Sequence, residues 1–556
     1  MTHGYHFDLL LLFVVIKMTR PIIQRLDHLG LIVAFCREIK LVETIDTLLP
    51  KQGKHFISHG QAILGMLLNG LGFHSRTLHM FSHFFKHKPV EHLIGDGIKA
   101  EHFNDDALGD TLDKLFDNNV SAIFQIIAAK TISNLGLESD AVHLDITSFH
   151  VDGEYKEAEE EDINIIKLVP GYSRDHRPEL NQAVLELICE NRAGLPIFLK
   201  ALSGNTNDSK AFHEITKRHI NSLKAAQNAR YLIADAALYT KNNVTKMDEN
   251  QQLFISRVPI TIGLAKKALL DLDTSDLVEI SEGYSGCWVS SNYGEVAQRW
   301  LLIKSEQAAK REEKSLKKRL EKKEKEELKA FEKLCKKAFA CEKDAQMALN
   351  EFDKKCEILG FTQSRVIEIP VFSKAGRPKK EQAPSKFCYQ ISGKASVNLT
   401  KIQLAKSKVG IFILATNELD EKALDMKKLL TNYKSQQKVE SGFRFLKNPE
   451  FLTSSIYLKN RKRVEALLMI MTLCLLVYAG IEHKMRQELA SRDEFFPSMV
   501  KNKTTSKPTA RWVFLKFEGI NLLEQDGKQL IVGLEEYQIR LLKILGKVYE
   551  QVYSKI

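Results

Sequence analysis

The alternation of apolar and polar residues divides the chain into regions with different repeats. From residue 22 to 130, apolar residues recur at helical spacing, most clearly in QAILGMLLNGLGF (61–73). From residue 142 the repeat changes to two, which indicates strands. A helical stretch is expected at 209–228, and strand-like segments occur at 142–150, 183–190, 195–202, 231–236, 253–258 and 410–416. The pattern therefore predicts an all-α N-terminal domain followed by an α/β region.

A segment of dense mixed charge, 305–357, interrupts the strand-like segments. Its sparse apolar residues favour a long solvated helix or a coiled-coil hairpin, and a basic ridge that contacts DNA is the alternative. The loop after it contains KAGRPKKEQAP (374–384). We favour an ordinary Pro/Gly loop there over a Gly-Arg-Pro segment lying in an A·T minor groove. An insertion within the α/β region is therefore expected.

At 556 residues the chain is longer than one hydrophobic core usually serves. The changes of pattern predict five regions: a helical N-terminal domain (20–135), the first part of an α/β core (136–262), an insertion domain with β segments and long charged helices (263–405), the second part of the core (406–490) and a C-terminal helical region (491–556).

The net charge and the cysteine content indicate which kind of partner and which cellular compartment to expect. The formal net charge of +11 and the pI near 9.0 favour a polyanionic partner, nucleic acid before membrane. The eight cysteines form no C-x-x-C pair, which indicates a reducing cytoplasm without a disulfide framework or zinc knuckle. His79, His83 and His87 have the spacing of a zinc site on one helix face. Packing or DNA-facing roles are favoured for them, because no cysteine or acid cluster completes the site.

Two apolar runs raise the question of a membrane. LLLLFVVI (9–16) resembles the apolar part of a signal peptide, but no basic residues precede it and no small-residue cleavage site follows. We interpret it as a buried or artefactual segment, with Met18 as a candidate start. ALLMIMTLCLLVYAGI (466–481) falls short of the roughly 20 residues that span a bilayer, so we expect a core helix and no membrane protein.

Three acidic residues stand in unusual local settings. Asp145 lies in HLDITSFHV (143–151), on the polar face of an alternating strand, although Asp is depleted in strands. Asp235 ends the apolar strand YLIAD, where side chains at a strand's end face a crevice. Glu440 lies in YKSQQKVESGFRFLKNP, which predicts a helix over 433–449 that ends at Asn448-Pro449.

On that predicted helix, one face carries a polar stripe and the adjacent face is apolar. The stripe consists of Tyr433, Gln436, Glu440, Arg444 and Lys447, and the apolar face of Val439, Phe443 and Leu446. A solvent-exposed face with a Glu440–Arg444 pair explains the charges. A solvent-exposed face does not explain why Tyr433 is present, or why Glu440 is the one acid beside two cations.

Three carboxylates in one crevice repel one another unless they are protonated or hold cations. Their hard oxygen atoms suit Mg²⁺, for which Mn²⁺ can substitute. Two such ions can activate a water or a 3′-hydroxyl and stabilise the leaving oxygen in phosphodiester displacement. The basic residues beside Glu440 would then hold the phosphates of the strand being cut.

At this point the chain resembles a known family. HLDITSFHV, YLIADAALYT and YKSQQKVESGFRFLK are similar to the three acidic motifs of DDE transposases encoded by bacterial insertion sequences. The resemblance is to the group with a β-rich insertion before the catalytic Glu and a Tyr-x2-Arg-x3-Glu-x6-Lys signature. That signature matches Tyr433, Glu440 and Lys447, while Gln436 stands where the group usually has Arg. LNGLGF, NDDALGDTLDKLF, GYSRDHRPEL, GNTND, ISRVP, FILATN and LKNRKRVEALLMIM extend the resemblance over roughly residues 25–490.

The resemblance implies an RNase H-like catalytic core, a mixed five-stranded sheet flanked by helices and interrupted by the insertion domain. Asp145 would lie on its first strand, Asp235 at the end of its fourth and Glu440 on a helix after the insertion, together holding two Mg²⁺ ions. In relatives the Tyr and Lys of the signature hold the DNA backbone, and a tryptophan of the insertion stacks on a flipped base. Trp288 and Trp300 are the candidates here, with core packing the favoured role for either.

GYSRDHRPEL lies between the first two core strands, close to where DNA should pass. Contact of Arg174, His176 and Arg177 with phosphates is weighed evenly there against a purely structural loop.

The resemblance also implies the partners. Double-stranded DNA, as terminal inverted repeats and target, is expected, with a homodimer in the DNA complex and a cytoplasmic, nucleoid-associated location. The helical N-terminal domain is the candidate for binding the DNA ends.

The expected function is a DNA transposase that cuts element ends hydrolytically and joins them to target DNA by transesterification. Two alternatives remain. A catalytically inactive DNA-binding relic would bind ends without nicking, and Gln436 leaves that option open. A metal-dependent nuclease would nick without strand transfer.

Overall fold

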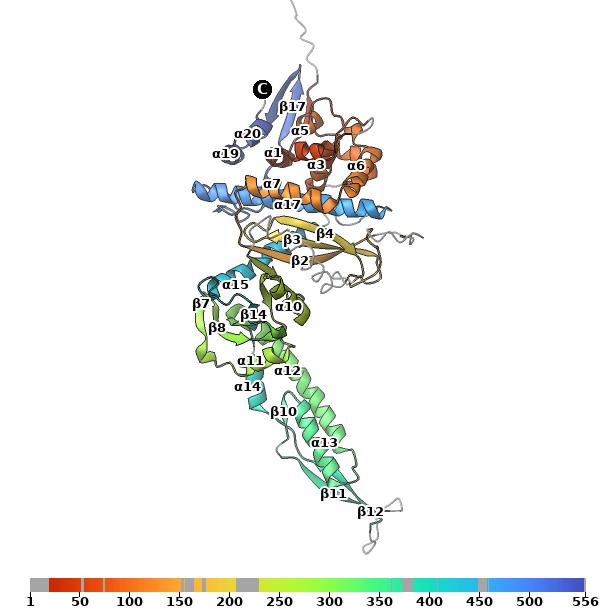
Figure 1. The fold of residues 1–556 in the computed structure, drawn as a ribbon, viewed down its shortest axis with the longest axis vertical. Helices are drawn as coiled ribbons and strands as arrows, with labels where there is room; N and C mark the ends of the chain where they lie inside the picture. The colour runs from red at the N-terminus through yellow and green to blue at the C-terminus, as the bar shows by residue number, and fades with distance from the viewer. Residues whose placement is uncertain are drawn as a thin grey trace, which may run out of the picture. The chain divides into compact units, whose positions relative to one another are not determined.

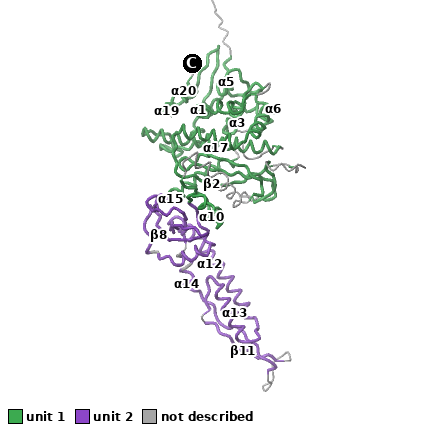
Figure 2. Tube along the Cα trace, viewed as in Figure 1, with its two compact units in different colours: residues 1–254, 431–556 green, residues 255–430 purple. Residues whose placement is uncertain are grey.

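The computed structural model describes residues 20–51, 55–73, 76–151, 155, 165–172, 177–206, 230–361, 363–372, 384–407, 409–448, 458 and 460–554. These residues form two compact units (Figure 2). The first unit takes in the chain up to Phe254 and from Thr431 onward, and the second is Ile255–Leu430. The boundaries fall inside β6 (Leu253–Arg257) and α15 (Met426–Lys434). Both units combine helices and strands, which confirms the predicted α/β class.

Helices dominate the N-terminal part of the first unit, as the apolar spacing predicts. They are α1 (Leu29–Glu38), α2 (Leu41–Leu48), α3 (His59–Leu71), α4 (Phe81–Phe85), α5 (Val90–Ile94), α6 (Asp105–Asp117) and α7 (Val120–Asn134). A capping box starts α3: the Gln61 N–H donates to the Ser58 hydroxyl at 3.2 Å, and the Ser58 N–H donates to the Gln61 side chain at 2.9 Å. Asn104 and Asn119 cap α6 and α7 by one bond each, in which the side chain accepts a backbone N–H, from Ala107 and from Ala122.

The first unit also contains four strands close to the predicted positions: β2 (Ala141–His150), β3 (Gln182–Glu190), β4 (Pro196–Ser203) and β5 (Tyr231–Ala234). Their order is β4-β3-β2-β5, with β3 antiparallel to both β2 and β4, and β5 parallel to β2. Every residue of β3 is buried, which explains its nearly continuous apolar sequence. The helix α10 (Lys241–Glu249) follows β5.

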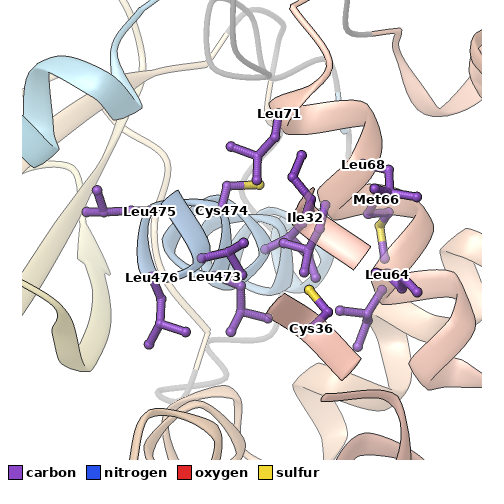
Figure 3. Packing of buried hydrophobic residues seen from close by; sticks show 14 of the residues in the cluster. Ile32, Cys36, Leu64, Met66, Leu68, Leu71, Leu473, Cys474, Leu475 and Leu476 are labelled. Carbon is purple, nitrogen blue, oxygen red and sulfur yellow. The ribbon is translucent and has the colours of Figure 1, made fainter. Parts of the chain in front are cut away.

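The apolar run near residue 470 forms the centre of a long helix, α17 (Arg461–Ser491). By length and composition α17 could cross a membrane, yet 83% of its most apolar stretch is buried inside the protein. Figure 3 shows Leu473 and Cys474 facing Ile32 and Cys36 of α1 and apolar residues of α3. The run is therefore a core helix, as the sequence predicts. All eight cysteines are free thiols.

A segment near the N-terminal end of the described chain pairs with one in the C-terminal region (Figure 1), which the helical pattern did not predict. Residues 22–25 form β1 (Ile22–Arg25), antiparallel to β17 (Asn521–Gln525), which also pairs with β18 (Lys528–Val532). Asp526 and Gly527 have φ angles of 51° and 74°, as a two-residue type I′ hairpin turn requires. The C-terminal region therefore combines strands with helices. Its other elements are β15 (Phe496–Pro497), β16 (Thr504–Thr505), α18 (Ala510–Lys516), α19 (Glu536–Leu545) and α20 (Lys547–Tyr553).

The second unit contains a set of antiparallel strands. β14 (Ile411–Thr416) lies between β6 and β9 (Gln298–Ser305), and β8 (Tyr284–Ser291) and β7 (Val278–Ser281) follow β9 outward. The charged segment forms α12 (Glu306–Cys335) and α13 (Glu342–Lys355), which confirms the predicted long helices. The remaining elements are α11 (Gly263–Leu270), β10 (Leu359–Gly360), β11 (Arg365–Val371), β12 (Lys386–Ser392), β13 (Ser396–Val397) and α14 (Leu399–Ser407).

A buried carboxylate joins α12 to the chain that leaves α13. Glu327 is 8% exposed, and its two oxygens accept the backbone N–H groups of Glu357, Ile358 and Leu359 at 2.7–3.2 Å. Hydrogen bonds to a charged acceptor are about twice as strong as neutral ones. Beside this carboxylate, Phe331 packs with Leu349, Phe361 and other residues in a small apolar core. Glu327 therefore fixes how β10 leaves the helical pair.

We predict that Glu327→Ala destabilises this part of the second unit by about 2–3 kcal/mol, because the N–H groups of buried Ile358 and Leu359, and that of Glu357, lose their acceptor. Hydrogen exchange of the amides at 357–359 should become faster. Glu326→Ala is the matched control, because Glu326 sits on the same helix in an exposed pair with Lys322 at 3.9 Å. Equal exchange in the two variants would contradict the role given to Glu327.

Candidate active site

Asp145 and Asp235 are brought together by the parallel pairing of β2 and β5. Leu144 is the Cα partner of Ala234, and the residue after each of them is one of the two acids: Asp145 on β2, and Asp235 directly after β5. Adjacent strands are about 4.8 Å apart, which places the two acids side by side at one level. The Asp145 Oδ1 accepts the Ile146 N–H at 2.8 Å, and the Asp235 Oδ1 accepts the Ala237 N–H at 2.9 Å. The second bond forms a local turn that ends β5 at Ala234.

The helix that carries Glu440, α16 (Gln436–Leu446), packs along β2. At its start, the Ser435 Oγ lies 2.9 Å from the Nε2 of His143, and at its end the Lys447 Nζ lies 6.0 Å from the centre of the Phe149 ring. His143, Asp145 and Phe149 are on one face of β2, because strand side chains alternate. The helix therefore runs along the face that carries Asp145.

The level of Glu440 along β2 follows from these two contacts. Glu440 is five residues after Ser435, which is about 7.5 Å of helix rise. Asp145 is two residues after His143, which is about 6.6 Å of strand. The two residues therefore lie at nearly the same level.

The apolar face predicted for this helix is buried. Val439, Phe443 and Leu446 are buried, whereas Glu440 and Arg444 are exposed. Gln436 and Lys447 are half-buried on the same flank as Glu440. The polar stripe from Gln436 to Lys447 thus borders the packed face of α16.

One feature of the predicted helix is wrong: residues 433–449 do not form a single helix. α15 ends at Lys434, α16 begins at Gln436, and Tyr433 belongs to α15. The cause is the Ser435 hydroxyl, which donates toward the carbonyl oxygen of Asn432 and competes with the helical backbone. The helix also ends at Leu446, earlier than Asn448.

The three acids fit a cation site in donor chemistry, since carboxylate oxygens are the ligands that Mg²⁺ and Mn²⁺ prefer. Two of them come from neighbouring strands and the third from the helix along the same face. In this structure, however, the described residues, Asp145, Asp235 and Glu440 included, form no group of three or more His, Cys, Asp or Glu side chains that could hold a metal ion. His79 lies outside α4, where His83 is, so the three spaced histidines do not share one helix.

The other DNA-binding candidates lie in different settings. Arg177 is exposed and bonded to Glu179, while Arg174 and His176 lie outside the described residues. Trp300 is 1% exposed and packs in the interior of the second unit, which gives it the packing role. Trp288 is half-buried, and the Arg299 guanidinium lies 4.3 Å from its ring centre.

Sequence reasoning missed His143, Asn191 and Asn432, which are joined with Ser435 by hydrogen bonds beside Asp145. The one available signal was a histidine in a buried strand, two residues before the acid. Its partners come from distant segments, so the sequence alone did not connect them.

A cavity of about 480 Å³ lies at β4, lined by the start of α7, Lys200 and Glu465. Burial raises the pKa of Glu465 to about 7, and the positive charge of Lys200 opposes that rise. At neutral pH the carboxyl group is therefore partly protonated.

Comparisons with known proteins identify a family. The family model "Transposase DDE domain" matches residues 138–477, and the model "Domain of unknown function (DUF4277)" matches residues 21–129. The first match spans more than half of the chain, which therefore belongs to the DDE transposase family. Domains of this family generally use divalent metal ions.

The other two comparisons add little. No curated protein matches the chain. Among solved structures, the chain is similar to a piggyBac transposase in a synaptic complex with hairpin DNA, with 9% identity and a TM-score of 0.37 over 90% of this chain and 83% of that one. A likeness of that size supports no argument about function.

Glu465 generates a pH prediction. Its pKa in the folded protein is above its ordinary value, so the folded state binds the extra proton and stability falls as pH rises from 4.5 to about 7. Because the group is partly exposed, we expect Glu465→Gln to stabilise the folded protein by only about 1–2 kcal/mol at pH values above about 7. Below pH 4.5 the substitution should not change stability. Thermal unfolding across the window measures this. Exposed Glu249 supplies the control variant Glu249→Gln, and a pH-independent difference would refute the assignment.

Proposed function

We propose that this protein is a DNA transposase that binds the terminal inverted repeats of an insertion sequence, cuts the DNA strand there and transfers it to target DNA. The observation that carries the proposal is the in-register pairing of Leu144 with Ala234, which sets Asp145 beside Asp235, in a chain of the DDE transposase family. The helix of Glu440 along the same face of β2 adds the third acid.

The fold supports an RNase H-like catalytic core. An antiparallel series of three strands and a parallel fourth form a mixed sheet. Asp145 is on its first strand in chain order, and Asp235 directly follows its fourth. α16 and α17 pack on the face that carries Asp145. The second unit, Ile255–Leu430, separates Asp235 from Glu440 in the sequence, as an insertion domain would.

The chemistry follows from the residues of the site. Asp145, Asp235 and Glu440 would hold two Mg²⁺ ions, or Mn²⁺, which supply a lowered water pKa and charge stabilisation at the reacting phosphate. A water would attack the phosphodiester at the element end, and the P–O bond to the 3′-oxygen breaks, which releases a 3′-hydroxyl. That hydroxyl would then attack a target phosphodiester, where a new P–O bond forms and the target strand's own 3′-oxygen leaves. Lys447 and Arg444, on the flank of α16 next to Glu440, are suited to hold the phosphates on either side.

DNA of both kinds, element end and target, is the proposed partner, in agreement with the net charge of +11. We assign end recognition to the helices at 29–134, and further DNA or subunit contacts to α12 and α13. A homodimer in the DNA complex and a cytoplasmic, nucleoid-associated location complete the proposal.

Asp145→Asn, Asp235→Asn and Glu440→Gln should each reduce nicking and joining by at least about 10³-fold, because each removes a charged ligand from the reacting centre. The assay contains purified protein, Mg²⁺, a labelled element end and a target plasmid. Glu249→Gln removes an exposed charge on α10 and should retain full activity.

The same assay distinguishes the alternatives. Binding without nicking by the unaltered protein would identify an inactive DNA-binding relic. Nicking without joining would identify a nuclease. If nicking persists in Glu440→Gln, the assignment of the third acid is wrong.

Gln436 provides a gain-of-function prediction. It is half-buried on the flank of Glu440 and Lys447, so an arginine there can add one phosphate contact. Gln436→Arg should steepen the salt dependence of DNA binding by about 0.9 in the log–log slope, and Arg444→Gln should reduce it by about the same amount. Fluorescence anisotropy without divalent ions measures both. Arg492→Gln, at the end of α17, is the control for a lost exposed charge. Unchanged slopes in both variants would show that the polar stripe of α16 does not contact DNA.

A further inference from the structure

Four polar side chains from separate segments meet beside the candidate active site. His143 is on β2, Asn191 follows β3, Asn432 is on α15, and Ser435 separates α15 from α16. The His143 Nε2 lies 2.6 Å from the Asn191 Oδ1 and 2.9 Å from the Ser435 Oγ. The Asn191 Nδ2 donates to the Asn432 Oδ1 at 3.1 Å. The Ser435 hydroxyl is also within bonding distance of the Asn191 Oδ1. We call this group the Ser435 network.

The directions of the bonds follow from the donors available. Asn191 uses its amide nitrogen toward Asn432, so its oxygen accepts, and His143 must carry a proton on Nε2 to donate to it. The Ser435 hydroxyl has one proton and two acceptors within reach, the Asn432 carbonyl oxygen and the Asn191 Oδ1, while its oxygen can accept from the His143 Nε2.

The network is not arranged for stability. His143 and Asn432 are 1% and 6% exposed, yet the His143 Nδ1 and the Asn432 Nδ2 have no hydrogen-bond partner among the described residues. Each such buried polar atom costs about 1–3 kcal/mol. Apolar residues at these positions would avoid that cost. A role in fixing geometry accounts for the network better than a role in stabilising the fold.

The apolar packing of α16 does not fix the position of the helix along its own axis. Val439, Phe443 and Leu446 bury an apolar face, and apolar burial is non-directional, so it tolerates sliding along the helix axis. A slide of one residue moves Glu440 by about 1.5 Å. Metal–ligand distances tolerate only about 0.2 Å. Hydrogen bonds at Ser435, directly before the first residue of α16, resist that slide because they are directional.

We propose that His143, Asn191, Asn432 and Ser435 are positioning residues that set the axial position of Glu440 relative to Asp145. His143 is two residues from Asp145 on the same strand face, and Ser435 is five residues from Glu440 on the chain that enters α16. The hydrogen bond between His143 and Ser435 therefore connects Asp145 to Glu440 through only a few residues. This inference rests on the proposed function, and it adds residues that act through Glu440 and touch neither DNA nor metal.

The test uses the full-length protein and three variants. Ser435→Ala removes the hydroxyl, Ser435→Thr keeps it, and Thr431→Ala removes an exposed hydroxyl one turn earlier on α15. Ser435→Ala should weaken Mn²⁺ binding, measured from the electron paramagnetic resonance signal of free Mn²⁺, by about 10–100-fold. It should slow single-turnover cleavage at saturating DNA by a similar factor without changing the Kd for DNA. Ser435→Thr and Thr431→Ala should match the unaltered protein.

The outcomes separate this inference from the proposed function. If Ser435→Ala lowers only the melting temperature, with Mn²⁺ affinity and the cleavage rate of folded protein unchanged, the network is merely structural and the inference is overturned. If the unaltered protein binds Mn²⁺ but never cleaves DNA, the proposed function fails, and the difference in Mn²⁺ affinity still decides the positioning role. An unaltered protein that binds no Mn²⁺ overturns both.

Discussion

The first unit is built around the burial of α17, and its other elements take their places from that helix. α17 packs against α1, α3, α6 and α7, and also against β4 and α16. The fit is close: a Cβ added to Gly480 would lie 2.3 Å from the ring of Phe35. Burial of apolar surface contributes roughly 25 cal/mol per Å², so a helix that is apolar on all sides is stabilised only when it is surrounded. α17 is surrounded because the N-terminal helices and the sheet pack on different sides of it.

That packing also determines where α16 lies. A Cβ on Gly442 would be 3.1 Å from the Leu475 side chain, and Phe445 stacks on Tyr478 with ring centres 4.4 Å apart. α16 is thus held between α17 and β2, which keeps Glu440 on the side of the sheet that carries Asp145. The two aspartates depend on a different force, the backbone hydrogen bonds between β2 and β5. The relative position of the two aspartates is therefore set by the backbone register of β2 and β5. The position of Glu440 along β2 needs directional contacts as well.

Much of the fold could be predicted, because its signals are local. The Ser58–Gln61 capping box, the continuous apolar residues of β3 and the sparse apolar spacing of α12 each indicate their element without distant partners. β1 could not be predicted in this way, because it is a strand only by pairing with β17, about 500 residues away in sequence. The β17–β18 turn was readable in principle from Asp526-Gly527. The break at Ser435 was not, since a serine inside a helical pattern usually leaves the helix intact.

The sequence by itself determined the candidate acids, the alternation that puts Asp145 on the polar face, and the apolar stripe that packs α16. These depend on residue type and on repeats of two and 3.6, which are properties of a short stretch of chain. Only the tertiary structure decided that Leu144 pairs with Ala234, that Trp300 is buried while Trp288 is not, and that Ser435 meets His143. Register and contact between distant segments are set by how several elements bury their surfaces together. The residues of a single helix or strand therefore do not determine these contacts.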